Sequence, residues 1–70
     1  MDKVIIAKAT DANIDRLQRI VRNFNANTNI KAFPSCDNEA VFFPIDEHDS
    51  KFVEEILTDN GFEVRTENAE

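Results

Sequence analysis

The sequence is short of the residues on which several classes of protein depend. It has one cysteine, Cys36, one glycine, Gly61, and no tryptophan or tyrosine. A single cysteine excludes an intramolecular disulfide framework and a zinc site built from several cysteines, and it favours a reducing compartment. A single glycine excludes a glycine-rich phosphate-binding loop. With few loops long enough to build a pocket, the chain is predicted to be no enzyme and to hold no cofactor or metal.

A long apolar run is also missing. The apolar residues 4–7 are interrupted by Lys8 and followed by Asp11. A membrane span needs about 20 predominantly apolar residues, so we expect neither a span nor a signal peptide. The expected protein is cytoplasmic, with no membrane partner.

Cations are scarce in the second half of the chain. The net charge is −6, from 8 Lys and Arg against 14 Asp and Glu. Residues 1–34 carry six cations and three anions, hence +3, whereas residues 35–70 carry two cations and eleven anions, hence −9. Capture of nucleic acid or anionic membrane requires clustered Lys and Arg, so direct nucleic-acid binding is disfavoured. The layout predicts a bipolar molecule.

The length predicts a single domain over residues 1–70. A chain of about 60 residues buries only about 60% of the surface that it exposes when unfolded. Oligomerisation or a partner is therefore expected to add stability.

The first half of the sequence predicts a strand and a helix. Residues 3–9 have no polar face, as in a central strand covered on both sides. Thr10 or Asp11 is expected to cap the helix, which should fray over residues 23–29, where asparagines alternate. Its apolar stripe, at spacings of three and four, consists of Ile14, Leu17, Val21 and Phe24.

A hairpin is predicted next. Residues 30–33 form a short strand that Pro34 ends, residues 35–38 form a turn, and residues 39–43 return as a strand. The proline cannot donate a ladder hydrogen bond, so we place it outside the strand.

The stretch 39–64 continues with a capped helix, a glycine stop and a last strand. Asp46 is the expected N-cap and Asp49 the acid three residues later. Gly61 ends the helix, residues 62–65 alternate as a half-exposed strand, and residues 66–70 are expected to be a frayed tail. The order strand, helix, strand, strand, helix, strand predicts an α+β, ferredoxin-like βαββαβ fold: a four-stranded antiparallel sheet with two helices on one face.

Two apolar pairs indicate a surface that needs a partner. Side chains alternate between the faces of a strand, so Phe42 and Phe43 cannot both lie under the helices, and neither can Val4 and Ile5. A contiguous apolar patch on the uncovered face of the sheet would mark an interface. We expect a partner protein or a second copy to cover it; the alternative is that the tail, a loop or the sheet twist does so.

The charged helices offer further candidate surfaces. An acidic second helix can imitate a phosphate backbone and occupy a basic groove on a partner protein, or can be merely solvated. Arginines on the first helix suit phosphate or carboxylate, or form a solvated face on which Asp15 pairs with Arg19. The predicted partner-binding residues are Phe42, Phe43, Glu47, Glu54, Glu55, Asp59, Arg16, Arg19 and Arg22.

Two chemical roles are disfavoured. Base stacking on a sheet uses aromatics of both central strands, yet residues 3–9 contain none and Glu39 begins the third strand where a cation is wanted. Cys36 and His48 are each unique, but two ligands fall short of a zinc site and no motif supplies a third catalytic group. We expect a simple thiol in a turn and a solvent-facing histidine.

The sequence therefore favours a non-enzymatic protein-interaction module. Its most concrete form is a small acidic inhibitor or adaptor that binds a basic, nucleic-acid-binding surface of a partner protein. One alternative is a small-ligand-binding regulatory domain that acts as a homodimer. Another is a homo-oligomer in which the +3 half meets the −9 half of a neighbour, a contact that salt would weaken.

Overall fold

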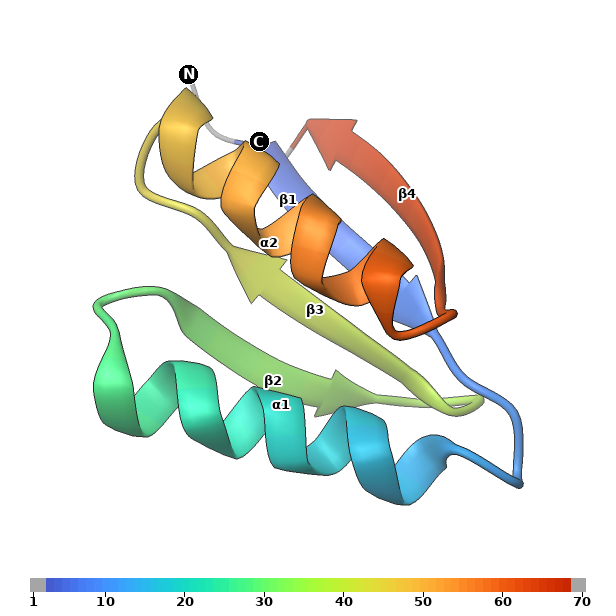
Figure 1. The fold of residues 1–70 in the computed structure, drawn as a ribbon. Helices are drawn as coiled ribbons and strands as arrows, with labels where there is room; N and C mark the ends of the chain where they lie inside the picture. Colours follow the sequence, from blue (N-terminus) through green and yellow to red (C-terminus); the bar gives the residue numbers. More distant parts are fainter. Residues whose placement is uncertain (1–2, 69–70) are drawn as a thin grey trace.

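Four strands and two helices follow one another in the order β-α-β-β-α-β in the computed structural model, which describes residues 3–68 (Figure 1). The strands form one antiparallel sheet in the order β2-β3-β1-β4, so β1 and β3 are central. Both helices cover the same face of the sheet, which confirms the predicted ferredoxin-like fold. The elements are β1 (Lys3–Lys8), α1 (Ile14–Asn27), β2 (Lys31–Ser35), β3 (Glu39–Phe43), α2 (Glu47–Asp59) and β4 (Glu63–Asn68). Neither helix in residues 3–68 has the length and apolar composition that a bilayer-spanning helix requires.

The core lies between the sheet and the helices. The central strands contribute Ile5, Ala7, Ala40 and Phe42, none of them more than 1% exposed. The ring of Phe42 meets the ring of Phe24 edge to face, with centroids 5.4 Å apart. The helices add Leu17, Val21, Phe24, Val53 and Leu57.

The first helix begins later than the sequence suggested. The predicted cap at Thr10 or Asp11 is wrong, because the N-cap is Asn13. The Oδ1 atom of Asn13 accepts hydrogen bonds from the backbone N–H and the hydroxyl of Thr10, at 2.6 and 3.0 Å. These bonds hold residues 10–13 in a turn, so the helix starts at Ile14. It also stays regular to Asn27, beyond the point where fraying was expected.

An asparagine on α1 covers the outer edge of β2. The Nδ2 atom of Asn25 donates to the carbonyl of Ala32 at 2.7 Å, and its Oδ1 accepts from the N–H of Ala32 at 2.9 Å. The side chain thus satisfies both edge groups of Ala32, as a neighbouring strand would. Pro34 lies inside β2, so the prediction that it ends the strand is wrong. An edge strand tolerates proline, since the missing N–H would face outward.

The second helix has both predicted end signals. The N–H of Asp49 donates to Oδ1 of Asp46 at 2.9 Å, which confirms the N-cap. At the other end Gly61 has φ of +84°, and its N–H donates to the carbonyl of Thr58 at 3.0 Å. The N–H of Phe62 reaches the carbonyl of Leu57 at 3.1 Å, which completes a Schellman motif.

The last strand is longer than predicted. β4 runs from Glu63 to Asn68 and pairs with β1 along its length. The expected tail over residues 66–70 is therefore wrong for 66–68, and residues 69–70 lie outside the described range. Residues 66–68 are polar and show no strand pattern of their own, but backbone hydrogen bonds to the central strand β1 keep them in β4.

Candidate interaction surface

Alternation along β3 separates the two phenylalanines between the faces of the sheet. Phe42 faces the helices and is fully buried, whereas Phe43 faces away from them with 40% of its surface exposed. The expectation that the two point to opposite faces is confirmed. Phe42 is not on any surface that a partner could reach, so its prediction as a partner-binding residue is wrong.

The same alternation applies to β1. Ile5 lies under the helices with no exposed surface, and Val4 and Ile6 lie on the other face. Val4 and Ile6 are nevertheless only 9% and 8% exposed. Side chains of the neighbouring strands therefore cover β1 even where no helix does. We call the helix-free side of the sheet the open face; its side chains come from alternate positions of all four strands.

An aromatic pair forms the most exposed apolar part of the open face. Phe33 on β2 is 53% exposed, and its ring lies edge to face on Phe43 with centroids 5.8 Å apart. Val41, half-buried, is opposite Phe33 in the register of β2 and β3. Sequence reasoning did not select Phe33. The signal was available, because Ala32 and Phe33 must face opposite sides of their strand.

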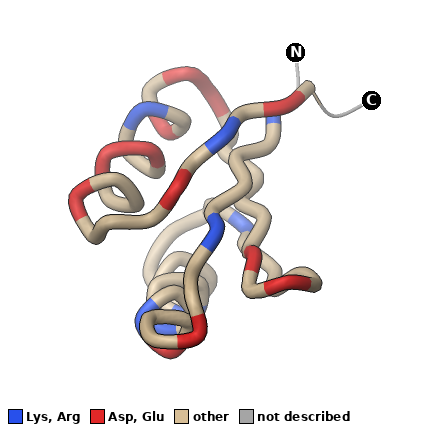
Figure 2. The backbone as a smooth tube through the Cα atoms, turned by 90° about the vertical axis from the view of Figure 1, so that its right-hand side faces the viewer, with Lys and Arg blue, Asp and Glu red and all other residues tan. Residues whose placement is uncertain are grey.

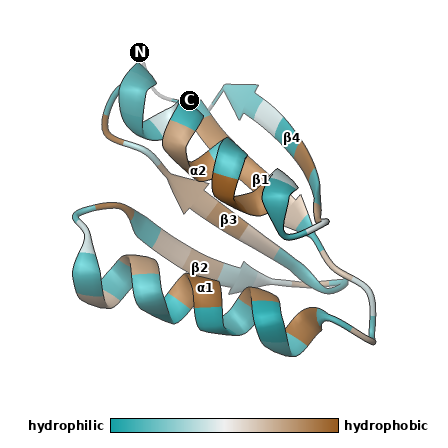
Figure 3. Cartoon of the chain, viewed as in Figure 1, coloured by the Kyte–Doolittle hydropathy of each residue, from teal (hydrophilic) through white to brown (hydrophobic). Residues whose placement is uncertain are grey.

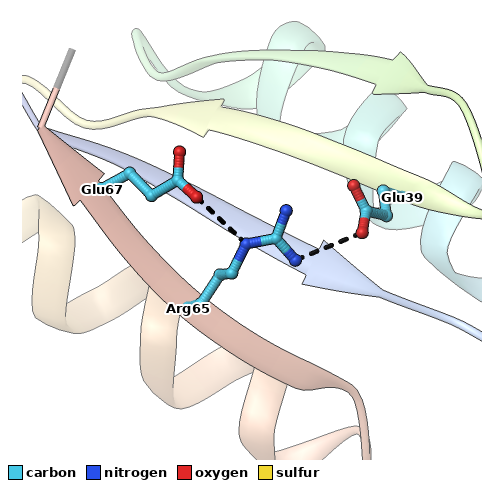
Figure 4. A network of polar contacts seen from close by, with 3 residues as sticks. All are labelled: Glu39, Arg65 and Glu67. Atoms are coloured by element: carbon cyan, nitrogen blue, oxygen red, sulfur yellow. Dashed lines mark hydrogen bonds and ion pairs between the residues drawn. The ribbon is translucent and has the colours of Figure 1, made fainter.

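A charged cluster borders this apolar area on the β4 side. Arg65 donates from Nε to Oε2 of Glu67 and from Nη1 to Oε2 of Glu39, both at 3.2 Å (Figure 4). These hydrogen bonds, with Glu39 contributing most, raise the pKa of Arg65. The guanidinium is thus held between carboxylates from β3 and β4, and it stays charged at all pH values at which the protein is handled.

The predicted acidic residues lie on the opposite layer of the molecule. Glu47, Glu55 and Asp59 on α2 are exposed and Glu54 is half-buried. Within residues 3–68 the ion pairs are the two made by Arg65, so the carboxylates of α2 have no cationic partner there. Figure 2 shows acidic residues along this helix. The open face and the acidic helix are therefore two separate surfaces rather than the single one that the sequence suggested.

The basic residues of α1 are exposed but differ in their contacts. Arg16 donates from Nη1 to the backbone carbonyl of Asn60 at 3.3 Å, which ties the start of α1 to the end of α2. Arg19 and Arg22 are exposed and form no ion pair in the described part of the chain. The expected pairing of Asp15 with Arg19 is absent there.

A shallow groove separates the two helices. It has a volume of about 250 Å³ and an apolar floor of Ile20, Phe24, Phe52 and Ile56. Figure 3 shows hydrophobic segments, in brown, alternating with hydrophilic ones, in teal, along α1 and α2. A second hollow of about 200 Å³ lies at the start of α2, next to Ile45. Both are below the roughly 300–1,000 Å³ typical of small-molecule sites.

Cys36 and His48 are kept apart by the fold. Cys36 lies in the turn before β3 and His48 in the first turn of α2 after it. A strand of five residues spans roughly 16 Å, too far for a hydrogen bond between the two side chains. In residues 3–68 no three side chains of His, Cys, Asp or Glu converge as metal ligands would.

Comparison with known proteins gives no match: no family model, no curated protein and no solved structure matches this chain.

Proposed function

We propose that this chain is a non-enzymatic protein-interaction module whose open face contacts another folded polypeptide. The observation that carries the proposal is the Phe33–Phe43 pair, two residues that are 53% and 40% exposed on a sheet face that no helix covers. Aromatic side chains are enriched at the centres of protein interfaces, where they bury a large area at a low entropic cost. In residues 3–68 the exposed large apolar side chains are Phe33, Phe43, Ile45 and Phe52. Phe33 and Phe43 contact each other on one face of the sheet, and this pairing supports binding there.

The proposal can be tested by placing a photoreactive benzoylphenylalanine at position 33 in the producing cells. The expected result is a crosslink to one defined polypeptide, self or foreign, after irradiation. The matched control is the same amino acid at Ile45, which is 63% exposed but lies outside the open face. Equal labelling from both positions, or none from position 33, would refute a specific contact on this face.

The acidic helix supports a more concrete version of the function. We place on α2 a surface for a basic partner, so that the protein acts as an inhibitor or adaptor on a nucleic-acid-binding groove. The support is that Glu47, Glu54, Glu55 and Asp59 have no cationic partner within residues 3–68. Uncompensated charge on a folded surface steers a partner of opposite charge.

A charge series tests this version. Wild-type protein on a resin is expected to capture a basic protein from a cell lysate, which salt or duplex DNA then releases. Replacing the four carboxylates with lysine should abolish capture, and replacing them with Gln or Asn should weaken it in part. Capture that is unchanged by the reversal would eliminate the electrostatic part of the proposal.

A regulatory domain that binds a small ligand as a homodimer is the second candidate. The supporting observation is the apolar groove between Ile20, Phe24, Phe52 and Ile56. Its volume is small, so a second copy would have to complete the pocket. A metabolite that raises the melting temperature of a dimeric sample would favour this candidate, and a metabolite screen without any stabilisation would count against it.

A further inference from the structure

We infer that the open face is a homodimer interface, covered by the same face of a second copy. The inference rests on the proposed function, because it names the partner of that surface. Its first support is charge: the open face carries three cations and three anions, a sum of zero, in a chain whose net charge is −6. A neutral face does not select a basic or an acidic partner, and it adds no repulsion of its own when two copies meet. The six residues are Lys8, Lys31, Arg65, Glu39, Glu63 and Glu67.

The strand register arranges the open face in three rows that run across the sheet from β2 to β4. One step beyond the pair of Ile5 and Phe42, the register brings Val4 opposite Phe43. The middle row is apolar except at its β4 end, and each outer row mixes charges of both signs. The rows are Ser35, Glu39, Lys8 and Glu63; Phe33, Val41, Ile6 and Arg65; and Lys31, Phe43, Val4 and Glu67.

These rows are complementary to themselves about one twofold axis. If two open faces meet about an axis parallel to the strands, β2 of one copy faces β4 of the other, and each row meets its own reverse. Lys31 then faces Glu67 of the second copy. Phe33 faces the β4 position of Arg65, whose guanidinium extends over β1 to Glu39 of its own copy. At the other positions of the three rows Val41 faces Ile6 of the second copy, Phe43 faces its Val4, Glu39 faces its Lys8, and Ser35 faces its Glu63.

The other in-plane axis gives a poor fit. With the axis perpendicular to the strands, Glu63 would face Glu67 of the second copy and Glu39 would face Phe43. Like charges would meet, and a carboxylate would lie on an apolar ring. Packed sheets are rotated by about 30°, so the pairing is closest near the centre of the face and looser at its corners.

The β2 edge of the sheet is less suited to self-association than the face. On β2 the side chain of Asn25 already occupies both outward backbone groups of Ala32. A second copy would have to displace it before it could add a strand there. Face-to-face packing leaves the two hydrogen bonds between Asn25 and Ala32 intact. It also leaves the acidic helix α2 of each copy on the outside of the dimer.

The expected dimer is weak. The face is four strands wide, at about 4.8 Å per strand, and about five residues long in the strand direction, so it measures roughly 20 by 17 Å. A stable interface buries about 800 Å² per partner, so this contact is expected to form at micromolar to millimolar concentration.

A charge swap tests both the face and the axis. Lys31 and Glu67 lie on the two outer strands, roughly 14 Å apart, so they cannot pair within one copy. We expect sedimentation equilibrium to show a wild-type dimer between roughly 10 µM and 1 mM. Lys31→Glu or Glu67→Lys alone places like charges at two contacts per dimer and should weaken it by about tenfold. Mixing the two variants should restore association, because the mixed dimer has opposite charges at both contacts.

The control is Lys51→Glu, which makes the same charge change on α2 and should leave the dimer unaffected. A wild-type protein that is monomeric at about 1 mM overturns the inference. It is also overturned if the mixture associates no better than the single variants, or if Lys51→Glu weakens the dimer equally. A crosslink from position 33 to a foreign protein, together with a monomeric wild type, would overturn the dimer but leave the proposed function standing. A monomer without any crosslink from position 33 would refute both.

Discussion

Arg65 on β4 donates a hydrogen bond to Glu39 on β3 at 3.2 Å, although β1 runs between their strands (Figure 4). In register Arg65 is opposite Ile6, and Glu39 is opposite Lys8. The guanidinium therefore crosses β1 diagonally, and Ile6 is only 8% exposed although no helix covers it. As a result, the exposed apolar area lies on β2 and β3, at Phe33 and Phe43.

The first prediction concerns the buried phenylalanine. Phe42→Ala removes a fully buried ring and should lower the free energy of unfolding by about 3–5 kcal/mol, measured by urea denaturation. A domain of this size has about 5 kcal/mol to lose, so much of the variant should be unfolded in buffer. Ile45→Ala, at a side chain 63% exposed, should change stability by about 0.5 kcal/mol or less. Similar losses in both variants would show that the core is wrongly assigned.

The second prediction concerns the covered edge of β2. Asn25→Ala removes two hydrogen bonds to Ala32 and should destabilise the protein by about 1–3 kcal/mol. Hydrogen exchange at the amide of Ala32 should accelerate in parallel. Asn27→Ala is the control, because Asn27 donates only to the exposed side chain of Asn23. Unchanged exchange at Ala32 would be evidence against the edge contact.

The third prediction concerns the end of α2. Gly61 has φ of +84°, and an added Cβ would meet no atom within 4 Å. The cost of Gly61→Ala is therefore conformational, and about 1–2 kcal/mol is expected. Gly61→Asn should lose less, because asparagine tolerates the left-handed region. If the alanine variant unfolds at the same urea concentration as wild type, the left-handed stop is not needed.

The fourth prediction concerns the charge of α2. Asp59 lies in the last turn, where the helix dipole disfavours an anion, and four residues after Glu55. Asp59→Lys should stabilise the protein by about 0.5–1.5 kcal/mol, an effect that salt reduces. Glu47→Lys makes the same net charge change in the first turn and should destabilise instead. Equal effects of both reversals would assign the result to net charge rather than to the helix ends.

Patterns within short segments predicted most of the fold. The stripe through Leu17 and Val21, the cap at Asp46 and the stop at Gly61 each depend on neighbours within a few residues. The N-cap of α1 was predicted wrongly because the side chain of Asn13 accepts a hydrogen bond from the backbone N–H of Thr10, three residues earlier. This bond forms a turn over residues that would otherwise suit a helix cap. The polar end of β4 was missed because its order comes from β1, about sixty residues earlier in the chain.

The sequence by itself determined the order of elements, the apolar stripes and the fact that one of Phe42 and Phe43 must face away from the helices. Only the tertiary structure decided which one, and it also placed Phe33 beside Phe43, Asn25 over Ala32 and Arg65 across β1. Each of these depends on how separate segments pair or pack, from 7 residues apart for Asn25 and Ala32 to 26 for Arg65 and Glu39. Register is set by the joint packing of sheet and helices, and a shift of one residue moves every side chain of a strand to the other face.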